Sequence, residues 1–192
     1  IDFELGEKNL LVTFHPVTLE KSTAKMQFQV LLNSISELIN TKIIFTKANA
    51  DTDGRIINSM IDDYVDNHKN TIAFASMGQL NYLSALQFVD AVVGNSSSGL
   101  LEAPSFKIGT IDIGDRQRGR IKANSVISCL PKKRDIDKAF NQLYSENFQN
   151  IINNVENPYG KGGASKEIVR TIKDIDLNGI LKKPFYDIKD IA

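Results

Sequence analysis

The six small residues from Gly94 to Gly99 form the segment best suited to binding a ligand. They read Gly-Asn-Ser-Ser-Ser-Gly and stand between an apolar run typical of a buried strand and a short apolar run typical of a helix. At such a turn the backbone can approach a ligand closely, and the N–H groups at the helix start suit a phosphate. Glu102, one helical turn later, would repel a phosphate at the same spot but can accept hydrogen bonds from sugar hydroxyls. Turn and acid together indicate a nucleotide diphosphate with its ribose.

Within this segment Ser96 and Ser97 are the candidates for phosphate contacts, and Glu102 is the candidate for the ribose. A turn that merely begins a helix is the alternative interpretation, because an acid near a helix start also favours the helix dipole.

His15 follows another strand-like run, and Pro16 fixes the turn after it. A histidine there can donate a hydrogen bond to a phosphate or sugar, or move a proton near neutral pH. A histidine packed at the end of a strand is the alternative.

Asn49 opens a polar segment, residues 49–55, that is typical of a turn and helix start. Its Asp and Thr residues suit the capping of N–H groups. Asp51 and Asp53 alone lack the remaining ligands of a calcium loop, so we expect no metal.

Met77 and Tyr82 follow the third strand-like run, where apolar groups could cover a flat nucleotide base. Packing of a helix on the core is the alternative, and for Tyr82 it explains the residue at least as well. Arg116, Arg118 and Arg120 form a positive patch after the fifth run. Because arginine forks match phosphate oxygens, we favour a phosphate role over a solvated loop.

The elements that must position these residues alternate along the chain. Runs rich in branched and aromatic residues predict strands at 10–14, 42–46, 71–75, 91–94, 109–114 and 125–130. Apolar residues at helical spacing predict helices at 25–39, 53–64, 80–88, 98–106, 135–144 and 164–172. This order predicts an α/β fold, with a Rossmann-like parallel sheet covered by helices on both faces. Ligands bind such sheets beyond the carboxyl ends of the strands, where the candidates stand. We expect one domain over 1–176 and a tail over 177–192.

Composition narrows the function further. The 192 residues are 42% hydrophobic and carry 23 acidic and 23 basic side chains without a basic block, which disfavours nucleic-acid binding. The apolar runs fall short of a membrane span, and because the first residues are acidic and lack an apolar stretch we expect no signal peptide. The single cysteine, Cys129, is expected to be a small buried residue. These features suit a cytoplasmic protein. Neither a P-loop, a dinucleotide Gly-x-Gly-x-x-Gly nor a Gly-x-Ser-x-Gly nucleophile motif occurs.

Five segments together resemble the UDP-N-acetylglucosamine 2-epimerases: residues 14–16, 49–51, 94–102, 113–120 and 157–160. The Gly-Asn-Ser-Ser-Ser-Gly run and the Arg-Gln-x-Gly-Arg run at 116–120 resemble the hydrolysing branch, which makes N-acetylmannosamine for sialic-acid-type sugars. That family uses two Rossmann-like halves facing across a cleft, the GT-B arrangement. The resemblance, over roughly residues 8–180, implies the carboxyl, UDP-binding half of a chain about twice as long. An isolated half is then expected to be inactive, and the first residue, which is not Met, agrees.

By position, the resemblance assigns His15 to the diphosphate and catalysis, Asn49 to the nucleotide, Met77 and Tyr82 to the uracil, Ser96 and Ser97 to phosphate, Glu102 to the ribose, and Arg116 to phosphate. It implies UDP-N-acetylglucosamine or UDP as ligand, the missing amino half as partner, no cofactor, and a homo-oligomer at full length. A non-hydrolysing epimerase or another GT-B sugar-nucleotide enzyme stays open, as does a nucleotide-binding module without catalysis.

Overall fold

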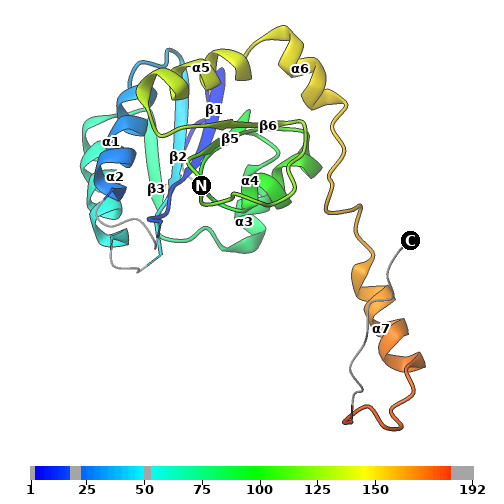
Figure 1. The fold of residues 1–192 in the computed structure, drawn as a ribbon. Coiled ribbons are helices and arrows are strands. Elements are labelled where there is room, and N and C mark those ends of the chain that lie inside the picture. Colours follow the sequence, from blue (N-terminus) through cyan, green and yellow to red (C-terminus); the bar gives the residue numbers. More distant parts are fainter. Residues whose placement is uncertain (1–2, 18–22, 50–52, 183–192) are drawn as a thin grey trace. The chain divides into compact units, whose positions relative to one another are not determined.

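The described residues build a sheet of six parallel strands (Figure 1). The computed structural model describes residues 3–17, 23–49 and 53–182. The strands are β1 (Lys8–Thr13), β2 (Thr41–Thr46), β3 (Thr71–Phe74), β4 (Ala91–Gly94), β5 (Gly109–Ile113) and β6 (Val126–Cys129). Their order across the sheet is β3-β2-β1-β4-β5-β6. The winding therefore reverses between β1 and β4, and in sheets of this kind ligands bind beyond the strand ends at such a reversal.

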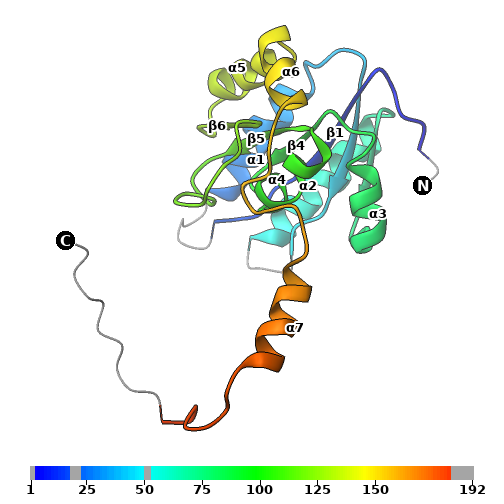
Figure 2. The same ribbon diagram turned by 90° about the vertical axis from the view of Figure 1, so that its right-hand side faces the viewer.

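Side chains alternate between the two faces of the sheet, and each face has its own hydrophobic cluster. Leu10 and Val12 enter one cluster, whereas Leu11 between them enters the other. The first cluster is covered by α1 (Ala24–Ile35), α2 (Gly54–Asn67), α5 (Lys133–Leu143) and α6 (Glu146–Asn153). The second cluster is covered by α3 (Gly78–Ala85) and η1 (Ala103–Phe106). Figure 2 shows helices on both sides of the strands, which confirms the predicted fold class.

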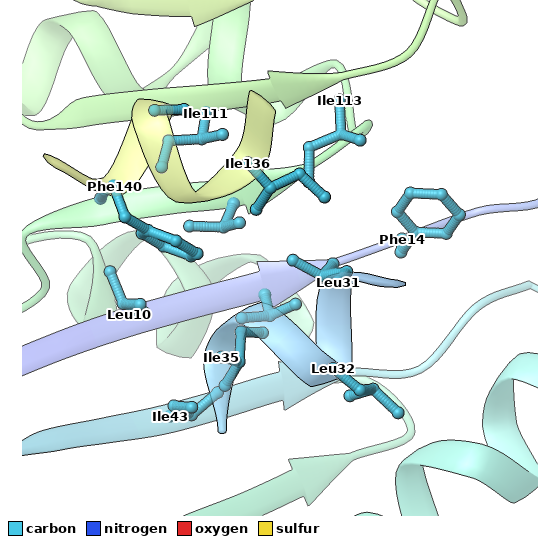
Figure 3. Close-up of a cluster of buried hydrophobic side chains, with 14 of the residues drawn as sticks. Leu10, Phe14, Leu31, Leu32, Ile35, Ile43, Ile111, Ile113, Ile136 and Phe140 are labelled. Atoms are coloured by element: carbon cyan, nitrogen blue, oxygen red, sulfur yellow. The ribbon is translucent and has the colours of Figure 1, made fainter. Parts of the chain in front are cut away.

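The larger cluster fixes β1 at the middle of the sheet. Figure 3 shows Leu31 and Ile35 of α1, together with Ile136 and Phe140 of α5, gathered around the strand residues of this face. Leu10 is completely buried there. Because burying a side chain of this size contributes about 1.5–3 kcal/mol, this packing holds the strand end that precedes His15 in place.

The helices predicted at 25–39 and 80–88 end earlier, at Ile35 and Ala85, and two further helical regions differ more from the sequence prediction. Residues 98–106 do not form one helix but α4 (Ser98–Leu101) followed by the short 3-10 helix η1. Pro104 has no N–H to continue the helix, so the chain changes to tighter turns there. The sequence prediction also missed α6, whose first turn is capped by Ser145: its hydroxyl accepts a hydrogen bond from the Phe148 N–H at 3.4 Å.

The chain forms two compact units, Ile1–Tyr159 and Gly160–Ala192. In the second unit α7 (Ala164–Asp174) begins after Gly163, whose φ of 89° lies in the left-handed region that favours glycine. The boundary that the sequence predicts at residue 176 stays a prediction. None of the helices in the described residues has the length and apolar composition needed to cross a membrane.

Candidate functional site

A cavity of about 380 Å³ lies at the carboxyl ends of the strands. Thr13 and Thr46, at the ends of β1 and β2, line it and are joined by a hydrogen bond between their hydroxyls. Six of the eight predicted site residues line this cavity: His15, Asn49, Met77, Tyr82, Ser96 and Glu102. The structure therefore brings together residues from the segments after β1, β2, β3 and β4, as parallel strands allow.

The other two predicted residues, Ser97 and Arg116, do not line the cavity. Ser97 stands immediately before α4, and its carbonyl accepts hydrogen bonds from the N–H groups of Leu100 and Leu101 at 2.9 Å each. Arg116, after β5, reaches the turn after β4 by donating from Nη1 to the Asn95 carbonyl at 3.0 Å. Arg116, Arg118 and Arg120 are all exposed, and the difference is the hydrogen bond that Arg116 makes to Asn95. Arg116 is thus the member of the arginine patch that the structure ties to the turn.

The turn after β4 depends on two glycines. A Cβ on Gly94, whose φ is 134°, would lie 2.0 Å from the Thr13 carbonyl oxygen. A Cβ on Gly99 would lie 2.5 Å from the Thr110 methyl carbon. Real Cβ atoms do not approach other atoms so closely, so these positions need glycine to bring β4 against β1 and α4 against β5.

The structure changes the reason for expecting phosphate at this turn. Because α4 has only four residues, Ser98–Leu101, its dipole is weak. The Ser98 N–H also points at the Ser96 hydroxyl oxygen, 3.4 Å away. The polar side chains near an anion here are therefore the hydroxyls of Ser96 and Ser97 and the neighbouring Arg116, rather than an extended helix start.

Glu102 and Tyr82 meet around this turn. Glu102 comes after the last residue of α4 and immediately before η1, so it gains nothing from the dipole of α4 but stands at the start of the next short helix, and the dipole interpretation stays an alternative. The Tyr82 hydroxyl and the Ser98 hydroxyl are 2.5 Å apart. Burial raises the pKa of Tyr82 to about 12, the Ser98 hydrogen bond lowers it and the charge of Glu102 raises it. Tyr82 therefore stays protonated near neutral pH and joins α3 to the turn.

Met77 and Asn49 also line the cavity. Met77 is buried and packs in the second hydrophobic cluster, so it both lines the cavity and fills the core. Asn49 is exposed in the segment after β2. Of the predicted capping residues, Asp53 makes no side-chain cap on α2, and Asp51 and Thr52 lie outside the described residues.

Asn95, which the sequence did not single out, connects three strand ends. Its Oδ1 accepts a hydrogen bond from the His15 N–H at 2.7 Å, and its Nδ2 donates to the His15 carbonyl at 2.8 Å. Its carbonyl accepts from Arg116 and also from Gln117 Nε2, at 2.8 Å. Asn95 and Gln117 are both buried. Their places inside the Gly-Asn-Ser and Arg-Gln-x-Gly-Arg runs were the signal available in the sequence.

Two remaining sequence predictions concern metals and the cysteine. Within the ranges that the structure describes, no three His, Cys, Asp or Glu side chains gather where they could hold a metal ion. That no metal takes part stays a prediction. Cys129 is half-buried rather than buried. Burial, followed by the charges of Asp112 and Asp135, raises the pKa of the Cys129 thiol to about 12, so the thiol stays protonated and unreactive.

Comparison with solved structures defines the class of fold. The C-terminal domain of a group 1 glycosyl transferase from Francisella tularensis matches 90% of this chain and 89% of its own length, with a TM-score of 0.54 and 12% identity. The S. aureus MnaA–UDP co-structure matches 92% of this chain but 48% of its own, with a TM-score of 0.70 and 21% identity. The fold is therefore that of one half of a GT-B enzyme.

Sequence comparison then gives the family. Residues 2–173 match the family model of UDP-N-acetylglucosamine 2-epimerase, and the chain belongs to this family. It is 37% identical over 191 residues to the GDP/UDP-N,N'-diacetylbacillosamine 2-epimerase (hydrolyzing) of Campylobacter jejuni, covering 98% of this chain and 49% of the relative. It is also 37% identical over 188 residues to the polysialic acid biosynthesis protein P7 of Escherichia coli, covering 97% of this chain and 48% of that protein. The chain thus spans about half the length of these curated relatives.

Proposed function

We propose that this chain is the UDP-binding part of a hydrolysing UDP-N-acetylglucosamine 2-epimerase in sialic-acid-type sugar biosynthesis. The reaction is the conversion of UDP-N-acetylglucosamine and water to N-acetylmannosamine and UDP. The observation that carries the proposal is the shared cavity at the strand ends, which His15, Ser96 and Glu102 line together. The likeness to hydrolysing relatives supports the hydrolysing outcome over a non-hydrolysing one.

In this proposal the parts of UDP meet different walls of the cavity. The diphosphate lies against Ser96 and His15 in the cavity, and Ser97 and Arg116, which do not line the cavity, are proposed to reach it from the turn after β4 and the loop after β5. Glu102 accepts hydrogen bonds from the ribose hydroxyls, because a carboxylate is an acceptor that suits a diol. The uracil lies along the segment from Met77 to Tyr82, with Asn49 beside the nucleotide.

The chemistry proceeds in two steps. A base from the other half of the protein removes the proton at sugar C2 while the bond between C1 and the diphosphate oxygen breaks, which leaves a C1–C2 double bond and free UDP. Water then adds its hydroxyl to C1 and a proton returns to the opposite face of C2, which inverts C2. The groups of this domain meet the negative charge that grows on the departing diphosphate, and interactions of this kind accelerate the bond-breaking step.

A second candidate substrate is supported by the names of the relatives. Proteins 37% and 30% identical to this chain are described as hydrolysing epimerases of N,N'-diacetylbacillosamine nucleotides. That sugar carries a second acetamido group, and the chemistry at C1 and C2 is the same. The homo-oligomer and the missing amino half belong to this proposal as well.

Titration calorimetry tests the nucleotide, and product analysis tests the reaction. We expect the protein to bind UDP more tightly than ADP, and Glu102→Gln to weaken UDP binding about tenfold through loss of a charged acceptor. Equal affinity for UDP and ADP would favour a nucleotide-sensing module instead. With the natural protein in its full length, free N-acetylmannosamine is the expected product. UDP-N-acetylmannosamine would indicate a non-hydrolysing epimerase, and a transferred sugar would indicate a glycosyltransferase.

A further inference from the structure

We infer that Asn95 is the positioning residue of this site, which sets His15 and Arg116 relative to each other for the diphosphate. The inference rests on the proposed UDP site and adds a residue to which neither the resemblance nor the relatives give a role. Asn95 does not line the cavity, so it acts through the two residues that it holds.

The side chain of Asn95 fixes the backbone of His15. Its carboxamide is paired with both polar backbone groups of that one residue, at 2.7 and 2.8 Å. With its N–H and its carbonyl both held, His15 keeps its Cα in place and its ring can turn only about its own side-chain bonds. Asn95 is 1% exposed, so water cannot replace these bonds without opening the structure.

The backbone of Asn95 is itself fixed and orients Arg116. Its N–H donates to the Thr13 carbonyl at 3.1 Å, a contact made possible by the close approach of Gly94 to the same oxygen. Its carbonyl receives one N–H of the Arg116 guanidinium. An exposed arginine samples many orientations in water, and this bond restricts it while other donors of the planar fork stay available to phosphate oxygens.

The protein contains a matched control for this arrangement. Asn9 makes the same two bonds to Gly6, accepting from its N–H at 2.9 Å and donating to its carbonyl at 3.0 Å. Asn9 is also buried, but it lies at the amino end of β1, away from the cavity residues. Asn9→Ala therefore removes an equivalent pair of bonds without touching the proposed site.

The test compares UDP affinity and thermal stability in the natural full-length protein for wild type, Asn95→Ala, Asn95→Asp and Asn9→Ala. Asn95→Ala should bind UDP at least about tenfold more weakly, because two groups that meet the diphosphate lose their placement. Asn9→Ala should lower the melting temperature by a similar amount and leave UDP affinity within about twofold. Asn95→Asp keeps the acceptor for the His15 N–H but cannot donate, and its charge repels phosphate, so it should also bind weakly.

Unchanged UDP affinity in Asn95→Ala overturns the inference, as does an equal loss in Asn95→Ala and Asn9→Ala. If Asn95→Ala does not fold, Asn95→Asp decides by the same criteria. If wild type does not bind UDP, the proposed function fails and the inference is judged by NMR of the histidine rings. The His15 signal, assigned with His15→Gln, should then move in Asn95→Ala or Asn95→Asp and stay unchanged in Asn9→Ala. If the His15 signal does not move in either Asn95 variant, the inference is overturned.

Discussion

At the amino end of the sheet, Asn9 pairs with Gly6, and at the carboxyl end Asn95 pairs with His15 in the same way. At the amino end the neighbouring polar groups form hydrogen bonds with one another. Asp90 accepts hydrogen bonds from the Asn9 N–H at 2.8 Å and from the Tyr144 hydroxyl at 3.4 Å. At the carboxyl end the same device stands beside a cavity. The pairing of Asn9 with Gly6 therefore serves stability, whereas the pairing of Asn95 with His15 lies next to the proposed ligand site.

The largest expected effect comes from the glycine that brings the two central strands together. Gly94→Ala should destabilise the protein by roughly 2–4 kcal/mol, because the new Cβ meets the Thr13 carbonyl and the positive φ is strained. Gly119→Ala is the control, since Gly119 has a φ of 81° and its new Cβ would have no neighbouring atom within 4 Å. It should cost about 1 kcal/mol in a denaturant titration. Equal losses in both variants would contradict the close approach.

Stability as a function of pH, combined with UDP affinity, compares the half-buried tyrosines at the two ends, Tyr82 and Tyr144. The folded-state pKa of Tyr82, about 12, lies above its ordinary value of 10.0, so the protonated form stabilises the fold below pH 10. That contribution, on the order of 2 kcal/mol, is lost as the pH rises from about 10 to 12.

The difference in the free energy of unfolding between wild type and Tyr82→Phe should therefore become smaller as the pH rises over this range. Burial and the charge of Asp90 also raise the pKa of Tyr144. The stability of Tyr144→Phe should therefore show the same kind of pH dependence relative to wild type as that of Tyr82→Phe. Only Tyr82→Phe should change UDP affinity. Parallel stability curves for wild type and Tyr82→Phe would show that Tyr82 is not protected from ionisation.

Exchanging arginines tests which part of the basic patch serves the site. Arg116→Lys should weaken UDP binding about tenfold, because lysine lacks the planar fork that donates to the Asn95 carbonyl and, in the proposed site, also to phosphate. Arg118→Lys is the matched control at an exposed position of the same loop, and calorimetry should show unchanged affinity. A loss of equal size in Arg118→Lys would point to the charge of the loop rather than to the anchored arginine.

The smallest effect is expected at the amino end. Asp90→Asn replaces a charged acceptor by a neutral one for the Asn9 N–H and should lower stability by about 1 kcal/mol. Calorimetry on Asp90→Asn and Arg116→Lys in parallel should show wild-type UDP affinity for Asp90→Asn. A clear loss of UDP affinity in Asp90→Asn would remove the distinction between the two ends.

The sequence predicted the strands well because each is a short apolar run bounded by polar residues, and parallel pairing followed from the helices between them. It placed His15, Ser96 and Glu102 at one edge for the same reason. It could not predict the role of Asn95, because the pairing joins residues 80 positions apart and shows only once β1 and β4 are neighbours. It missed α6 although Ser145 followed by Glu146 is a usable helix start. It also predicted one helix across Pro104, whereas the structure has α4 followed by η1, because Pro104 has no N–H to continue the helix.

The pairing of β1 with β4, with Thr13 opposite Gly94, has a consequence for folding. These strands are separated by β2, β3 and the helices between them, so their contact closes a long loop and is expected to form late. In the proposed site UDP contacts both His15 and the serine turn, so partly folded chains in which β1 and β4 are not yet paired should not bind it. UDP should consequently raise the unfolding temperature of the whole sheet unit in proportion to the logarithm of its concentration, rather than stabilise one local segment.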